Sequence, residues 1–188
     1  MSLTNPAPFT LQGLHFELPG LDLSGPSAQL FLRGSRQLDG RLSGNISASV
    51  PASLVGILWR EAAPRGRLEV VGEISGTEAA PRVEGVLRLE GGSLRIPGLP
   101  APVTGIDGVA ELAGDVMSLR KVRFAFQGGT GTCSGQLRLW PALELDLALN
   151  VSGVRWPLTQ GFEPSLDGEL RLGGDLSGLQ LSGQLSLR

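Results

Sequence analysis

The sequence predicts an all-β protein in which consecutive, mostly antiparallel strands curl into an open, apolar-lined trough, with one short helix. Three observations support this class. Apolar residues alternate with polar ones over most of the chain, which is the period of a strand with one buried face. Gly- and Pro-containing segments separate these runs. The fragment Gly-x-Leu-Arg-Leu recurs at 85–89, 135–139 and 168–172, without the fixed period of a solenoid.

Residues 1–66 are predicted to form an N-terminal β segment. Apolar residues alternate from residue 9 to 32, and a longer alternation runs from Leu38 to Val50. A short helix is expected at about 51–63. Pro51 suits a first helical turn, and the next proline, Pro64, ends the pattern.

Residues 67–188 are predicted to form a second run of strands that continues beyond residue 188, so the chain is expected to be an internal piece of a longer protein. Strands are expected where the alternation resumes, at 68–74, 83–89, 94–96, 106–112, 122–126, 137–139, 143–151, 170–172, 179–181 and 185–187.

One face of these strands is expected to form the inner wall of the trough. Its candidate residues share the apolar phase of the alternation: Ile74, Val83, Leu87, Leu89, Leu94, Ile96, Val122, Phe124, Phe126, Leu137, Leu139, Leu143, Leu145, Leu147, Leu149, Leu170, Leu172, Leu181 and Leu185. The repeated glycines share this phase, and Gly85 and Gly91-Gly92 are expected to mark bends. The arginines of the repeats have the opposite phase and should face solvent: Arg88, Arg138 and Arg171. Arg95, between Leu94 and Ile96, is expected to face outward as well.

The composition argues against several classes of function. The net charge of −2 gives no electrostatic basis for nucleic-acid binding. The single cysteine, Cys133, forms no intrachain disulfide, and no group of residues has metal-ligand spacing or suggests a cofactor. His15 is the only histidine, and Gly131–Gly135 resembles a nucleophile elbow without a histidine downstream. No catalytic residue is therefore predicted, and the chain is not expected to be an enzyme.

The order of the strands and glycines between residues 66 and 139 resembles the TamB family of AsmA-like envelope proteins. The segments that carry the resemblance are 67–72, 75–77, 81–97, 106–112, 119–124 and 129–135, with 174–187 similar to the start of another block. Residues 1–50 have no counterpart in this pattern.

The resemblance implies that residues 67–188 form a β-taco repeat, a long sheet curled into an open trough with an apolar inner wall. It also implies that the chain is a periplasmic portion of an inner-membrane-anchored envelope protein. Its implied activity is conduction of phospholipid between the inner and outer membranes along a hydrophobic groove, linked to outer-membrane biogenesis. Its implied partners are phospholipid acyl chains and an outer-membrane barrel of the TamA/BamA type.

A second interpretation of the same alternation is a closed β-sandwich that acts as a structural spacer or adhesin module and binds no ligand. The two interpretations differ in whether the apolar face is open or covered. Exposed strand edges are also expected to allow edge-to-edge pairing between copies of the chain.

Overall fold

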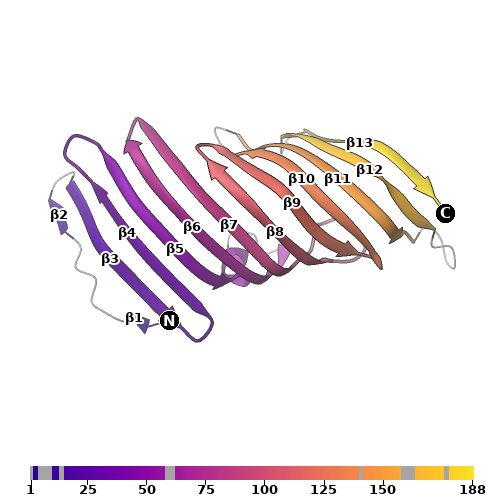
Figure 1. Cartoon of the computed structure of the whole chain (residues 1–188), viewed down its shortest axis with the longest axis horizontal. Helices are drawn as coiled ribbons and strands as arrows, with labels where there is room; N and C mark the ends of the chain where they lie inside the picture. The colour runs from indigo at the N-terminus through magenta and orange to yellow at the C-terminus, as the bar shows by residue number, and fades with distance from the viewer. Residues whose placement is uncertain are drawn as a thin grey trace.

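A computed structural model describes residues 2–3, 10–12, 15–57, 62–139, 142–157, 164–175 and 178–188. It confirms the all-β class: thirteen strands form one sheet (Figure 1). The elements in chain order are β1 (Ser2–Leu3), β2 (Thr10–Gln12), β3 (His15–Gly25), β4 (Ala28–Arg36), β5 (Leu42–Pro51), the 3₁₀ helix η1 (Ala52–Ile57), β6 (Arg65–Thr77), β7 (Ala80–Leu94), β8 (Val103–Ala113), β9 (Val116–Phe126), β10 (Gly129–Arg138), β11 (Glu144–Arg155), β12 (Ser165–Asp175) and β13 (Gly178–Leu187).

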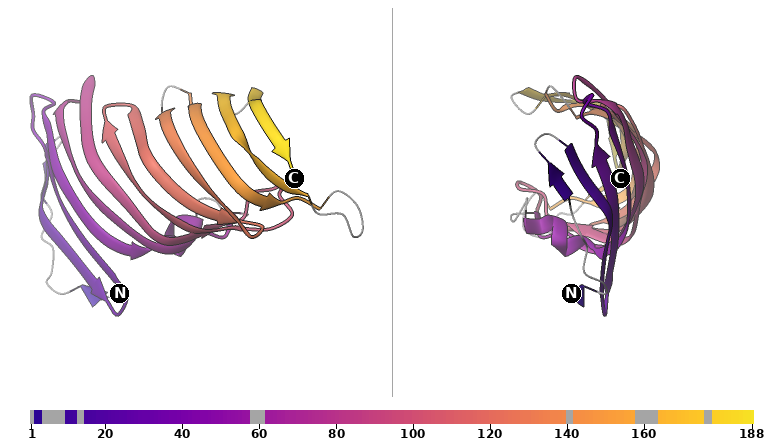
Figure 2. Two further views of the ribbon diagram at one scale, coloured as in Figure 1. Left: turned by 45° about the vertical axis from the view of Figure 1, so that its right-hand side comes forward. Right: turned by 90° about the vertical axis from the view of Figure 1, so that its left-hand side faces the viewer.

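The strands from β3 to β13 pair in sequence order, and every pairing is antiparallel. β1 and β2 both pair with the free side of β3. The sheet curves into a trough, and η1 lies on its concave side near one end of the strands (Figure 2). Eleven strands about 4.8 Å apart give a trough roughly 48 Å long.

The trough has a small core for its size. The buried hydrophobic residues among those described are Ala28, Ala52, Ala62, Ala110, Phe126, Leu147 and Val154, and no large side chain among the described residues is completely buried. No second sheet covers the first in the described part of the chain. The closed sandwich considered from the sequence therefore does not fit this architecture.

The two strands predicted at 83–89 and 94–96 form a single strand, β7, which ends at Leu94. The register of β7 against β8 shifts on both sides of Gly92. At the shift, Gly91 has a φ of +57°, and its N–H donates to the Asp107 carboxylate at 2.8 Å. The glycine pair thus marks a bulge rather than a turn, because glycine adopts the left-handed conformation without a steric penalty.

The described part of the predicted helix is of the 3₁₀ type. It covers Ala52–Ile57, whereas Pro51 is the last residue of β5 and pairs with Arg67. Residues 58–61 of the expected helix lie outside the described residues. Gly56 lies within Ala52–Ile57, and glycine is unfavourable in the interior of an α-helix.

Residues 15–51 belong to the same sheet as the rest of the chain. β5 and β6 pair without a register shift from Gly44 opposite Ile74 to Pro51 opposite Arg67. The sheet therefore continues across residue 66. Among the described residues, no helix has both the length and the apolar character needed to cross a bilayer.

Candidate functional site

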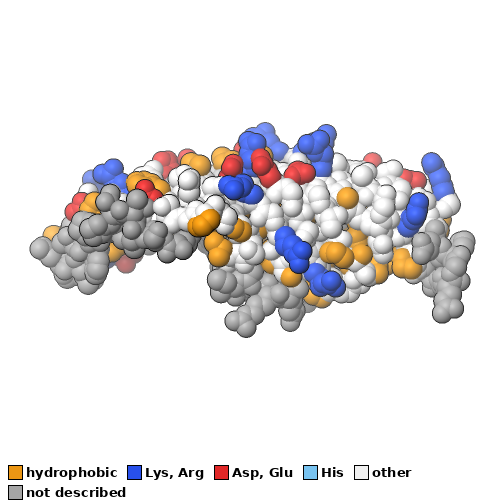
Figure 3. Space-filling model, turned by 90° about the horizontal axis from the view of Figure 1, so that it is seen from below, with side chains coloured by type: hydrophobic (Ala, Val, Ile, Leu, Met, Phe, Trp, Pro, Cys, Tyr) orange, Lys and Arg blue, Asp and Glu red, His pale blue; other side chains and the backbone are white. Residues whose placement is uncertain are grey.

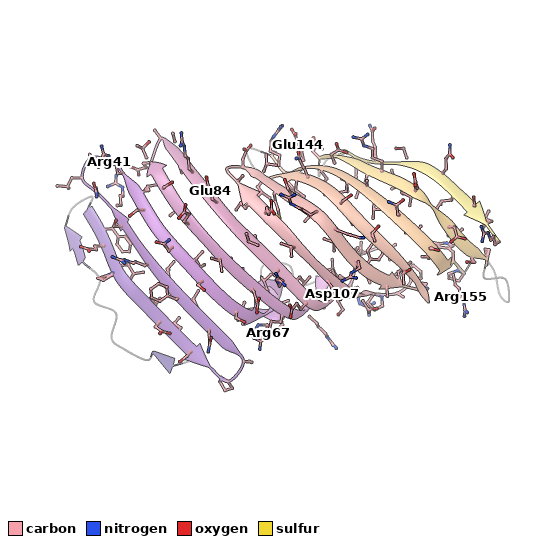
Figure 4. The ribbon with its side chains drawn as sticks, viewed as in Figure 1. Arg41, Arg67, Glu84, Asp107, Glu144 and Arg155 are labelled. Atoms are coloured by element: carbon pink, nitrogen blue, oxygen red, sulfur yellow. The ribbon has the colours of Figure 1, made fainter. Side chains whose placement is uncertain are left out.

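The sheet has one apolar face and one polar face. Residues opposite each other on neighbouring strands lie on the same side of the sheet, and the apolar residues of each strand lie mostly opposite those of the next. The side chains of the apolar face are mostly half-buried, and those of the other face are mostly exposed. Glu84 projects from the polar face toward the viewer in Figure 4, and Figure 2 shows that this is the convex side. In Figure 3, most acidic side chains and several basic ones lie along the upper border, whereas the lower part shows hydrophobic side chains with some Lys or Arg side chains among them. We call the apolar, concave side the inner face.

One row of residues crosses the entire inner face without a polar side chain. We call it the central row; each member lies directly opposite the next: Leu23, Leu30, Ala48, Val70, Leu87, Ala110, Leu119, Gly135, Leu147, Leu172 and Leu181. This continuity depends on register, since a slip by one residue would turn a strand's apolar residues outward.

Most of the predicted wall residues lie within strands, at positions that face the inner side of the sheet. These are Ile74, Val83, Leu87, Leu89, Leu94, Val122, Phe124, Phe126, Leu137, Leu145, Leu147, Leu149, Leu170, Leu172, Leu181 and Leu185. They come from β6, β7 and β9–β13, so the pairing brings together residues more than a hundred positions apart.

Three predicted wall residues lie outside the strands. Ile96 follows the end of β7 and is 38% exposed, because the proline-rich connection after it leaves the sheet. Leu139 follows β10, although its N–H still donates to the Asp115 carbonyl at 2.8 Å. Leu143 precedes β11 and is half-buried.

The two predicted residues on β13 are more exposed than the other predicted wall residues. Leu181 is 64% exposed and Leu185 is 49% exposed, compared with 9% for Leu147. Leu181 and Leu185 are exposed because β13 pairs with β12 alone among the described strands.

A groove of about 610 Å³ lies on the inner face of β3–β8. Apolar side chains from both the N-terminal strands and the predicted wall line it, including Leu18, Leu32, Ile46, Val70 and Leu87. The first four were not among the predicted wall residues. The period-2 alternation of residues 14–50 was the signal for Leu18, Leu32 and Ile46, but the face they share with Leu87 follows only from the strand pairing.

Glycines on the inner face allow neighbouring strands and side chains to approach closely. A Cβ atom added at Gly108 would lie 2.7 Å from Val122 Cγ2, and one added at Gly44 would lie 2.9 Å from Ile74 Cγ2. Gly85 lies opposite Gly72 in a regular ladder, so the expected irregularity is found at Gly91-Gly92 and not at Gly85.

The outer face carries paired charges, including two of the arginines that the repeats predicted to face outward. Arg171 makes two hydrogen bonds to the Asp146 carboxylate, both 2.8 Å long, and Arg138 donates to Glu144 at 2.9 Å. The hydrogen bonds from Arg171 lower the pKa of Asp146 from its ordinary value. Arg88 and Arg95 are also exposed.

A second hollow, of about 910 Å³, lies between β8 and β13. Its lining includes the outer-face residues Asp107, Arg123, Thr132, Asn150 and Glu169, together with apolar side chains such as Phe124 and Val151. Arg123 lies opposite both Asp107 and Thr132 in the sheet. This hollow therefore has a different chemistry from the apolar groove.

The resemblance of Gly131–Gly135 to a nucleophile elbow is confined to the sequence. Cys133 lies within β10 and is half-buried on the inner face, opposite Val122 and Leu149. Burial raises the pKa of its thiol, which disfavours the reactive thiolate. No cluster of metal-ligating side chains occurs in the described part of the chain. The side chain of His15 lies outside the described residues.

Comparison with known protein families, curated proteins and solved structures finds no match to this chain.

Proposed function

We propose that this chain is a segment of a bridge-like lipid transfer protein that conducts phospholipid along its inner face. The observation that carries the proposal is the central row, which crosses eleven strands with apolar residues or glycine at every position. A folded soluble sheet normally covers such a face, because exposed apolar surface is unfavourable in water. An acyl chain would supply that cover.

The dimensions of the trough suit an acyl chain. Half of a bilayer's hydrocarbon core is about 15 Å thick, which corresponds to roughly three strand spacings. A chain lying along the central row from Val70 on β6 to Leu119 on β9 would thus remain against apolar side chains throughout. Each methylene group removed from water contributes about 0.8 kcal/mol. The headgroup would remain in water at the open side of the trough.

The order of motifs that resembles the TamB family supports a more specific setting for this proposal. In that setting the chain belongs to the periplasmic part of an envelope protein anchored in the inner membrane. It conducts phospholipid between the inner and outer membranes and works with a barrel of the TamA/BamA type.

A charge on the inner face provides the test. Leu87 and Arg88 are neighbours on β7 that face opposite sides of the sheet. Leu87→Asp should reduce the extraction of a fluorescent phospholipid from vesicles by at least about tenfold, because an acyl chain cannot pass a charge without a large desolvation cost. Arg88→Asp should extract lipid as the unchanged chain does.

Circular dichroism would show that both variants keep the sheet. Equal extraction by the two variants would contradict the proposal. If the unchanged chain extracted no lipid, the spacer or adhesin function would be favoured instead.

A further inference from the structure

The outer face of β4–β7 differs from the rest of the outer face, because large apolar side chains are exposed on it. Phe31 is 43% exposed, Val71 is 61% exposed and Val86 is 45% exposed. On β8–β12, by contrast, the outer face carries polar residues and ion pairs such as Arg171–Asp146. We call Phe31, Val71 and Val86 the outer patch.

The outer patch lies along a single row across the sheet. Ser47 lies between Phe31 and Val71 in this row, and Val71 lies opposite Val86. Because the side chain of Ser47 is short, a hollow of about 520 Å³ separates Phe31 from Val71. From Phe31 to Val86 the row spans three strand spacings, or about 14 Å, which is the length of roughly nine residues of α-helix. The patch therefore offers a helix both length and depth.

Carboxylates lie at both ends of the outer patch. Asp22 lies opposite Phe31 and lines the hollow. At the other end, Glu73 and Glu84 lie directly opposite each other, two residues along from the valines of the patch, and Glu84 projects from the convex side (Figure 4). Among the described residues, neither Glu73 nor Glu84 forms an ion pair. Like charges directly opposite in a sheet are destabilising, so the stability of the fold does not explain this pair.

The arginines near the outer patch lie opposite other residues. Arg88 lies opposite Glu69, Arg82 opposite Ser75 and Arg33 opposite Asn45. Farther along the row, the Glu111 carboxylate accepts two hydrogen bonds from Arg120. The carboxylates at the ends of the patch thus remain open to a cationic group of a partner, and a cation between Glu73 and Glu84 would relieve their repulsion.

We propose that the outer patch is a docking surface for a basic amphipathic helix of a partner protein. Apolar side chains of that helix would cover the outer patch, and a lysine or arginine beside them would lie between Glu73 and Glu84. Such a contact removes exposed apolar surface from water and neutralises the like-charge pair. An anionic membrane surface fits less well, because the same carboxylates would repel it. The inference concerns the outer face alone, so it does not depend on lipid conduction along the inner face.

A synthetic helix provides the test. The probe is a peptide of about 15 leucine and lysine residues with the period of an amphipathic helix, and its control has glutamate in place of lysine. Fluorescence anisotropy should show that the lysine peptide binds the unchanged chain at least about tenfold more tightly than the glutamate peptide. Equal binding of the two peptides, or no binding of either, would overturn the proposal.

Paired variants locate the binding. Glu73→Gln with Glu84→Gln should weaken binding of the lysine peptide at least about tenfold, because its charge contacts are lost. The control, Glu111→Gln with Glu144→Gln, removes the same charge from carboxylates that arginines already hold, and should bind as the unchanged chain does. Equal weakening by both pairs would show attraction to the net charge alone and would contradict the proposal.

Two further measurements separate docking from a structural role. Val71→Thr with Val86→Thr keeps the shape of both side chains and should weaken peptide binding at least about threefold, because apolar contact area is lost. Glu73→Gln with Glu84→Gln should raise the melting temperature, since it removes the like-charge pair; a lower melting temperature would assign the two carboxylates to stability and contradict the proposal. If the unchanged chain self-associated in sedimentation and the threonine variant did not, the outer patch would be a contact between copies and the proposal would be wrong.

Discussion

The inner and outer faces of the sheet are built from the same strands, and neighbouring residues on one strand often belong to opposite faces. Leu147 and Ala148 illustrate this on β11. Leu147 lies between Gly135 and Leu172 and is 9% exposed, whereas Ala148 lies between Ser134 and Arg171 and is exposed. The difference shows that phase along the strand and register between strands decide the environment of a residue, because successive side chains point to opposite sides.

The largest contrast is expected between two phenylalanines on the two faces. Phe126 is 7% exposed on the inner face and packs near Trp156, with 6.2 Å between ring centroids, whereas Phe31 is 43% exposed on the outer face. Phe126→Ala should lower the free energy of unfolding by about 3 kcal/mol or more, because it leaves a cavity. Phe31→Ala should cost less than about 1 kcal/mol.

Urea denaturation of the two variants would measure this contrast. Similar losses of stability for both variants would show that the inner face is not the better packed side of the sheet.

A smaller contrast is expected between glycines on the two faces. Gly108→Ala would place a methyl group 2.7 Å from Val122 Cγ2 on the inner face, and should cost about 1–3 kcal/mol through crowding. Gly173 lies on the outer face, where the nearest atom to an added Cβ is the Leu145 carbonyl oxygen at 3.7 Å. Gly173→Ala should be neutral or stabilising by up to about 1 kcal/mol. Thermal unfolding of both variants would check the order, and a more damaging Gly173→Ala would contradict the assignment of faces.

The smallest effect is expected from the charges of the outer face. The pKa of Asp146 is lowered by Arg171 from its ordinary value of 3.8. The contribution of this pair to stability is therefore present above that value, and it is lost as the pH falls through the folded-state pKa. Asp146→Asn should have its full effect at about pH 6, where a surface pair is still a weak contributor.

The difference in stability between the unchanged chain and Asp146→Asn should shrink as the solution is acidified toward the folded-state pKa. Urea midpoints at several pH values would follow this change. A difference that grows on acidification would contradict the pairing.

The fold class and most wall residues were predictable because the alternation is a local property of the sequence. Leu87, Leu147 and Leu170 could be assigned to one face in this way. The sequence did not reveal that β7 is a single strand, since a bulge at Gly91-Gly92 resembles a turn until the partner strand is known. The exposure of Leu181 also depends on the absence of a neighbouring strand, which alternation does not encode.

Residues 15–51 show most clearly what sequence reasoning missed. Their alternation was visible, but their place in the trough depended on the pairing of β5 with β6. This pairing brings Leu32 and Ile46 into the apolar groove. Long-range register is set by the whole sheet, so it cannot be read from one segment.

The central claim is that acyl chains contact the inner face along its length and do not contact the outer face. Photo-crosslinking groups at Leu87, Phe124 and Leu147 sample the inner face of β7, β9 and β11, and groups at Arg88 and Glu144 sample the outer face of β7 and β11. After illumination with phospholipid vesicles, mass spectrometry should find lipid attached at all three inner positions and at neither outer position. Lipid captured equally at Arg88 and Glu144, or at none of the inner positions, would contradict this account.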